Sequence, residues 1–191
     1  EKQPLNLKDK LELIHRLSDT GLKSIEIGAF VSPKWIPQMA DSDRIANELK
    51  KVKNNKVQYL ALVPNKQGME KAIQSGLTEV AIFGACSETF SQRNINCSIS
   101  ESFNRFKDVM TLAKRHKIKV RGYLSTAFGC PYEGKISVQK VKQMTNKLFD
   151  LGVYEVSISD TIGVATPVQV KKVLKSLKEI KASKLAMHFH D

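Results

Sequence analysis

The stretch EVSISDTIGVATPVQVKKVLKSLKEIKASKLAMHFH, residues 155–190, decides the fold class. Its first part, residues 155–161, is a short and mostly apolar run that is typical of a β-strand. Thr166-Pro167 then marks a helix start, because threonine caps helix N-termini and proline is favoured at the first helical position. The helix has one apolar face, made by Val170, Val173, Leu174 and Leu177, and lysines on the other. Residues 185–190 predict a second strand, so the stretch is one strand–helix–strand unit.

The same alternation of strand and helix recurs along the chain. The predicted strands are 24–30, 57–63, 79–85, 119–125, 155–161 and 185–190. Their starts are about 32 residues apart on average, which matches the repeat of an eight-fold barrel of about 250 residues. We therefore predict an α/β fold, a (β/α)8 TIM barrel of which about six strands are present. A doubly wound open sheet is the alternative, but no glycine-rich phosphate loop follows the first strand.

Capping residues indicate where the intervening helices begin. Asn65, Ser98 and Ser137 each carry a side-chain oxygen that can accept a hydrogen bond from the first helical turn. The predicted helices include 42–53, a helix from Ser98 to about His116, and one that ends near Gly152.

A single barrel domain is predicted over residues 1–191. The length and the 41% hydrophobic content suffice for one core. Six strands alone would leave two unpaired apolar edges, which stable proteins avoid. We therefore expect the domain to be incomplete at both ends, as the interior of a longer barrel.

Composition and charge narrow the class of protein. No apolar run approaches the roughly 18 residues that a membrane span needs, so we predict no membrane binding. Cys86, Cys97 and Cys130 lack the spacing of a zinc finger or a disulfide framework and are expected to be thiols. The net charge of +12 comes from dispersed lysines without a nucleic-acid motif, so we predict no nucleic-acid partner. A small phosphate-bearing ligand would exploit the same positive charge.

The motif His188-Phe189-His190 ends the last predicted strand. Side chains alternate faces along a strand, so the two imidazoles can converge on one ion. Two imidazoles are half a metal site, and the alternative is a pair of histidines that bind no metal.

Other polar residues lie in or just after the predicted strands. They are Glu26, Arg121, Tyr123, Ser125, Ser157, Ser159, Asp160 and Thr161. Buried ionisable groups are costly unless they are paired or bound to a ligand. Glu26 and an arginine such as Arg121 could form a structural ion pair, or they could border a polar cavity with the histidines. We favour the cavity and expect Glu26, Arg121, Ser157, Asp160, His188 and His190 at or near the same end of the sheet.

Several motifs together resemble the 3-hydroxy-3-methylglutaryl-CoA (HMG-CoA) lyase family. They are Ser24-Ile-Glu26 with residues 30–39, Asn94-Ile-Asn-Cys-Ser98, Arg121-Gly-Tyr123, residues 129–136, Asp160-Thr-Ile-Gly163 and His188-Phe-His190. The motifs FVSPKWIPQM and GCPYEGKI are the most specific to this family, whereas His-x-His also occurs in the related isopropylmalate and homocitrate synthases.

The resemblance implies a metal-dependent enzyme that cleaves HMG-CoA to acetyl-CoA and acetoacetate, as in leucine degradation and ketone-body formation. It implies that His188 and His190 bind Mg²⁺ or Mn²⁺, that His188 and Glu26 are catalytic, and that His188 acts as the base. Substrate-binding roles are implied for Arg93, Asn94, Arg121, Tyr123, Ser157 and Thr161. Arg93 and Asn94 are expected in a loop near the CoA moiety. A homodimer is also expected, located in the cytoplasm if bacterial or the mitochondrial matrix if eukaryotic.

The family also has site residues with no counterpart in this chain. An Arg-Asp pair would precede Glu1, and an asparagine ligand and a catalytic cysteine would follow Asp191, so we expect the isolated chain to be inactive. The alternatives are a related condensing barrel enzyme, a catalytically incomplete fragment or binding module, and a basic nucleic-acid binder.

Overall fold

The computed structural model describes residues 4–52 and 56–190. The chain divides into two compact units, residues 1–81 with 111–119, and residues 82–110 with 120–191. The single barrel domain over residues 1–191 stays a prediction.

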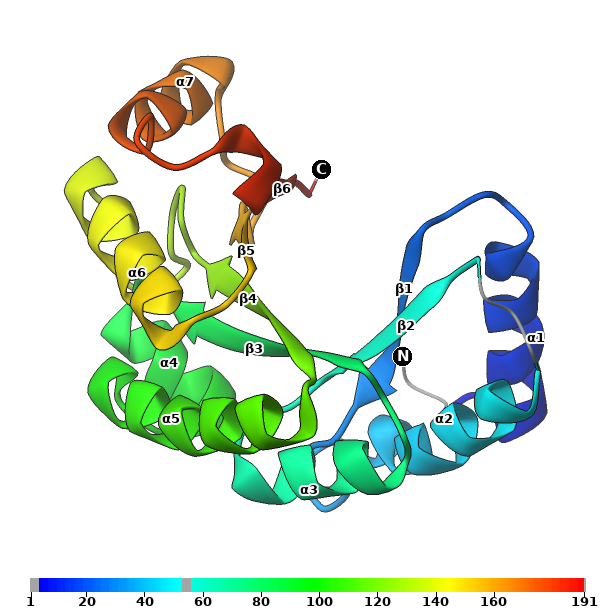
Figure 1. Ribbon diagram of the computed structural model, residues 1–191. Helices are drawn as coiled ribbons and strands as arrows, with labels where there is room; N and C mark the ends of the chain where they lie inside the picture. The colour runs from blue at the N-terminus through cyan, green and yellow to red at the C-terminus, as the bar shows by residue number, and fades with distance from the viewer. Residues whose placement is uncertain (1–3, 53–55, 191) are drawn as a thin grey trace. The chain divides into compact units, whose positions relative to one another are not determined.

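The six strands follow one another in the sheet in chain order. The pairs β1–β2, β2–β3, β4–β5 and β5–β6 are parallel. Helices separate the strands along the chain, as parallel pairing requires (Figure 1). The predicted α/β class, with six strands of a (β/α)8 barrel, is confirmed. The strands are β1 Ser24–Ala29, β2 Gln58–Leu62, β3 Glu79–Ala85, β4 Lys119–Ser125, β5 Glu155–Ser159 and β6 Leu185–His188.

The first unit packs helices against one face of β1. Ile25, Ile27 and Ala29 are buried, whereas Ser24 and Glu26 are exposed, because successive side chains point to opposite faces. The predicted cap at Asn65 is confirmed, since its Oδ1 accepts a hydrogen bond from the Gly68 amide at 3.0 Å. The helices are α1 Leu7–Ser18, η1 Pro37–Met39, α2 Ser42–Lys51 and α3 Lys66–Gln74. Position 53, the predicted end of the second helix, lies outside the described residues.

The second unit holds α4, most of α5, and the elements from β4 onward. Ser137 and Thr166 cap helices as predicted, and Thr166 forms a reciprocal capping box with Gln169. Ser98 also accepts from the Glu101 amide, at 3.1 Å. The helices are α4 Glu88–Ile95, α5 Ile99–His116, α6 Val138–Leu151, α7 Pro167–Ser176 and η2 Ala182–Lys184.

Four strands are shorter than predicted, and one helix was not predicted. The strands predicted over 24–30 and 57–63 are Ser24–Ala29 and Gln58–Leu62. The strands predicted over 155–161 and 185–190 end earlier, at Ser159 and His188. Helix α4 was not predicted, because only Ser91 within it is buried and it therefore lacks apolar periodicity. Within the described ranges, no helix combines the length and the hydrophobicity that crossing a bilayer requires.

Candidate functional site

One face of the β4–β5–β6 sheet carries several of the predicted polar residues. Gly122 of β4 faces α6, because a Cβ there would meet Leu148 at 3.4 Å. Tyr123, its neighbour, is therefore on the opposite face. Tyr123 is in register with Ser157, and Ser159 is in register with His188. The structure thus brings Tyr123, Ser157, Ser159 and His188 onto one face of three adjacent strands.

The imidazoles of His188 and His190 lie beside each other at the end of β6. Their ring centroids are 4.6 Å apart and their planes are inclined by 62°. Nδ1 of His190 lies 2.9 Å from the carbonyl oxygen of Asp160. A carbonyl oxygen only accepts, so Nδ1 carries the hydrogen and the lone pair of Nε2 is left for another partner. This arrangement of an outer carbonyl that sets the tautomer is common around metal-binding histidines.

Asp160 organises the loop that holds this histidine. Its buried carboxylate accepts hydrogen bonds from the amides of Val164, at 3.0 Å, and Ala165, at 2.9 Å. Its own amide donates to the carbonyl oxygen of His188 at 2.8 Å. The motif Asp-Thr-x-Gly pointed to this residue, but its part in shaping the loop became visible only in the structure.

Thr161 connects the ends of β4 and β5. Its Oγ1 accepts a hydrogen bond from the amide of Thr126 at 2.7 Å. Thr126 has a φ of 58°, which is unfavourable for a β-branched residue. The amide of Cys86 also donates to Oγ1 of Thr126, at 3.3 Å. Strained backbone of this kind persists where the surroundings hold it, and it clusters at functional sites.

Arg121 lies at the other end of the sheet from the histidine pair, and Glu26 belongs to the first unit. Nε of Arg121 forms a 2.6 Å ion pair with Glu155. Glu155 is the first residue of β5, whereas His188 is in register with its last residue. The expectation that Arg121 lies at the same end as His188 is therefore wrong, and its substrate contact stays a prediction. Glu26 lies on β1 in the other unit, and its catalytic role also stays a prediction.

Arg93 and Asn94 lie in helix α4, so their predicted loop placement is wrong. The helix forms because Ser87 caps it, accepting from the amide of Phe90 at 3.0 Å. The guanidinium carbon of Arg93 lies 4.3 Å from the centroid of the Tyr132 ring. The Arg93 and Asn94 side chains are exposed, so both are accessible to a ligand.

The three cysteines are free and buried, which agrees with the prediction of thiols. Burial raises the pKa of Cys86 to about 12. A thiol with such a pKa is protonated at neutral pH, so Cys86 is a poor nucleophile.

The histidines fit part of a divalent metal site. Across residues 4–52 and 56–190, no group of three or more histidine, cysteine, aspartate or glutamate side chains is placed to hold an ion. His188 and His190 nevertheless offer two nitrogen donors side by side, and His190 already has its tautomer set. Imidazole suits several divalent transition metals, and Mn²⁺ is among those that proteins bind with mixed nitrogen and oxygen ligands.

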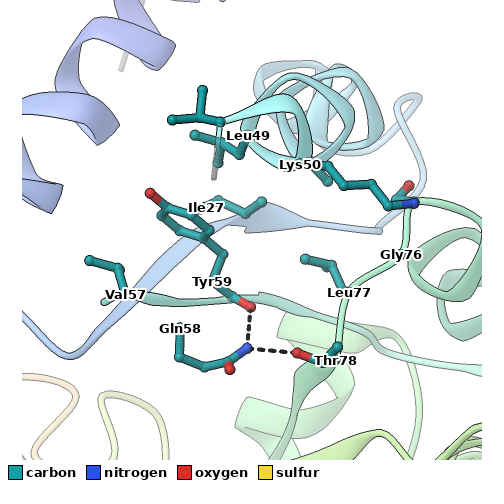
Figure 2. A pocket seen from close by; sticks show the side chains of 12 residues that line it. Ile27, Leu49, Lys50, Val57, Gln58, Tyr59, Gly76, Leu77 and Thr78 are labelled. Carbon is teal, nitrogen blue, oxygen red and sulfur yellow. Dashed lines mark hydrogen bonds between the residues drawn. The ribbon is translucent and has the colours of Figure 1, made fainter. Parts of the chain in front are cut away.

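A cavity of about 400 Å³ lies in the first unit, and none of the predicted site residues lines it. Figure 2 shows its lining, in which Nε2 of Gln58 donates to Oγ1 of Thr78 and to the Tyr59 carbonyl oxygen, both at 3.0 Å. Gln58 begins β2, and Thr78 directly precedes β3. Active sites of strand–helix barrels lie at the other, carboxyl-terminal ends of the strands, so we do not include this cavity in the candidate site.

Comparisons with known proteins agree along the whole chain. A family model described as HMGL-like matches residues 1–191. The chain is 50% identical over 183 residues to the cytoplasmic 3-hydroxy-3-methylglutaryl-CoA lyase of Mus musculus, a match that covers 95% of the chain and 53% of the mouse protein. The chain therefore spans about half the length of this curated relative.

Solved structures give the same result. The chain is similar to the hydroxymethylglutaryl-CoA lyase of Pseudomonas aeruginosa, with a TM-score of 0.90, 46% identity, and coverage of 100% of this chain and 63% of that one. It is also similar to an HMG-CoA lyase from Acinetobacter baumannii in complex with coenzyme A and 3-methylmalate. There the TM-score is 0.94, the identity is 32%, and the match covers 100% of this chain and 62% of that one.

Proposed function

The chain belongs to the HMGL-like family, and from this membership we propose that the protein cleaves HMG-CoA to acetyl-CoA and acetoacetate. The observation that carries the proposal is the contact of the His188 and His190 rings within a chain that matches the family over its whole length. The relatives carry this activity in their names. A homodimer, and a cytoplasmic or mitochondrial location that depends on the source, stay predictions.

His188 is proposed to start the reaction by taking the proton of the tertiary hydroxyl at a ring nitrogen. The alkoxide becomes the ketone of acetoacetate as the carbon–carbon bond breaks. The electron pair of that bond passes to the thioester enolate, which takes a proton to give acetyl-CoA. His188 and His190 would also hold the Mg²⁺ or Mn²⁺, which when bound supplies a Lewis acid at the substrate oxygens. Because a neutral imidazole has one lone pair, His188 would act as the base only while that lone pair does not hold the ion.

The remaining polar residues are proposed to bind and orient the substrate. Tyr123 and Ser157 share the sheet face of His188 and could donate hydrogen bonds to the acyl group. Thr161 already accepts from Thr126, so its hydroxyl hydrogen is the part left for a ligand. Glu26 is proposed as a carboxylate near the reacting atoms. Asn94 and Arg93 are proposed to contact the CoA moiety.

Product analysis of the full-length protein tests this proposal. With HMG-CoA and Mg²⁺, mass spectrometry should find acetyl-CoA and acetoacetate in equal amounts. A related condensing enzyme would instead consume acetyl-CoA and a 2-oxoacid. Condensation products without cleavage of HMG-CoA would overturn the proposal.

A further inference from the structure

The loop 129–134 is held in one conformation by contacts that converge on Cys130. The backbone groups of Cys130 and Gly134 exchange two hydrogen bonds, of 2.8 and 2.9 Å. The Cys130 thiol donates to Oγ of Ser87 at 3.0 Å. Its sulfur accepts from the amides of Tyr132, at 3.4 Å, and Glu133, at 3.5 Å. The backbone that carries Tyr132 is therefore wrapped around a buried sulfur atom.

Helix α4 is fastened to the same loop. Oε1 of Glu133 accepts a hydrogen bond from the amide of Thr89, in the first turn of α4, at 2.7 Å. Ser87, which receives the Cys130 thiol hydrogen, is also the N-cap of α4. The loop and the helix are thus joined at two points, and Tyr132 has a set position relative to α4.

Tyr132 of the loop contacts Arg93 of α4. Phe90 and Arg93 are three positions apart, on one side of α4. The Phe90 and Tyr132 ring centroids are 6.5 Å apart, and the Arg93 guanidinium carbon is 4.3 Å from the Tyr132 centroid. Despite these contacts, Tyr132 is 48% exposed. A tightly held loop thus supports an aromatic ring that remains open to solvent.

The stack leaves the hydrogen-bond donors of Arg93 available. Among the described residues, no carboxylate forms an ion pair with Arg93. A guanidinium that stacks through its flat face keeps its N–H groups at the edge, where they match the geometry of phosphate oxygens. An exposed stack of this kind contributes little to stability, so folding stability alone is a weak reason for so many restraints.

We propose that Tyr132 is a positioning residue that orients Arg93 to hold a phosphate group of the CoA moiety. This inference rests on the proposed function, since it assigns the CoA-binding part of that same site. Tyr132 restricts the rotamers of the arginine before the ligand arrives, and this lowers the entropy that binding would cost. The effect belongs to ligand binding and leaves the bond-breaking step unchanged.

Calorimetric titration of CoA into the full-length protein tests this role. Tyr132→Leu removes the aromatic ring and should weaken CoA binding about two- to fivefold, the equivalent of 0.5–1 kcal/mol. Tyr132→Phe keeps a ring and should bind CoA as the wild type does. KM for HMG-CoA should rise by the same factor in Tyr132→Leu, and kcat should stay within about twofold.

A double-mutant cycle separates positioning from a general disturbance. In an Arg93→Gln background, Tyr132→Leu should have no further effect on CoA affinity, because the ring then has no guanidinium to orient. Equal losses in both backgrounds, or wild-type affinity in a folded Tyr132→Leu protein, would overturn the inference. Tyr132→Gln is a second ring-deleting variant in case Tyr132→Leu does not fold.

Ligand variants identify which phosphate is held. If Arg93 holds the 3′-phosphate, Arg93→Gln should weaken the binding of CoA but not that of 3′-dephospho-CoA. If Arg93 holds the diphosphate, the substitution should weaken the binding of both and leave the binding of pantetheine unchanged. Two results would contradict a phosphate contact. One is pantetheine binding that Arg93→Gln weakens as much as CoA binding. The other is inorganic phosphate that competes with CoA no better in the wild type than in Arg93→Gln. A protein that shows the cycle with CoA but does not cleave HMG-CoA would support this inference while the proposed function fails.

Discussion

The chemistry open to the His188-Phe189-His190 motif depends on a neighbouring residue, Asp160. The two imidazoles lie side by side, with His190 just beyond the end of β6, and the carbonyl of Asp160 selects which nitrogen of His190 keeps a lone pair. A residue thirty positions away in sequence thus decides how one histidine can act.

Replacing His188 should show its proposed double role. In the full-length protein, His188→Ala should lower kcat at least about 10³-fold, because loss of a general base alone costs roughly 10²–10⁴. Glu26→Ala should also lower kcat. The matched control is His116→Ala, at the exposed end of α5, which should remain within about twofold in a steady-state assay. A His188→Ala enzyme as fast as the wild type would refute the mechanism.

Thr161 should contribute to the stability of the fold as well as to the proposed binding of substrate. Thr161→Val removes the oxygen that accepts from the Thr126 amide, and an unsatisfied buried donor costs about 1–3 kcal/mol. Urea denaturation should therefore show a loss of that size in the free energy of unfolding. Thr161→Ser keeps the oxygen and should lose less. Equal stability of the valine and serine variants would show that this hydrogen bond contributes nothing.

At the scale of elements, α4 and the loop 129–134 stabilise each other, although neither has a strong local sequence pattern. The helix has few buried residues, and the loop consists largely of turn formers. Each is stabilised by the other through Ser87, Cys130 and Glu133. This mutual support explains why the sequence indicated a loop where the structure has a helix.

The contact between Glu133 and α4 should make this element sensitive to acid. The hydrogen bond from the Thr89 amide lowers the pKa of Glu133 below its ordinary value of 4.5. The folded state therefore favours the carboxylate, so this stabilisation is present above the unfolded pKa and is lost as pH falls through the folded pKa. As the pH falls from about 5 to about 3, through the ordinary glutamate pKa of 4.5 and below it, the melting temperature of the wild type should fall more than that of Glu133→Ala. Parallel curves in a thermal melt series would contradict the assignment.

At the scale of the whole molecule, the candidate site is assembled from strand ends and loops that are distant in sequence. The face shared by β4, β5 and β6 carries the polar groups, and the opposite face packs on helices. The two nitrogen donors at the end of β6 would supply part of the proposed metal site rather than all of it, so the proposed activity depends on the complete protein.

Metal removal tests that dependence. Treatment of the full-length protein with a chelator should abolish HMG-CoA cleavage, and Mg²⁺ or Mn²⁺ should restore it, because these ions accept mixed nitrogen and oxygen ligands. The chelated protein should keep its CoA affinity if Arg93 binds phosphate independently of the ion. Full activity after exhaustive chelation would contradict the proposed cofactor.

Local patterns along the chain predicted the order and type of most elements. Capping residues such as Asn65 and Thr166 and the apolar strand runs act over a few positions, so they are visible locally. The two-residue period of a strand predicted that the two histidines converge, but the strand ends at His188, and His190 is placed by its contact with the Asp160 carbonyl oxygen. The partners of Arg121, Arg93 and Thr161 lie on other elements, at Glu155, Tyr132 and Thr126. These contacts could not be predicted from the sequence, because strand register and helix packing bring together side chains that no local pattern relates.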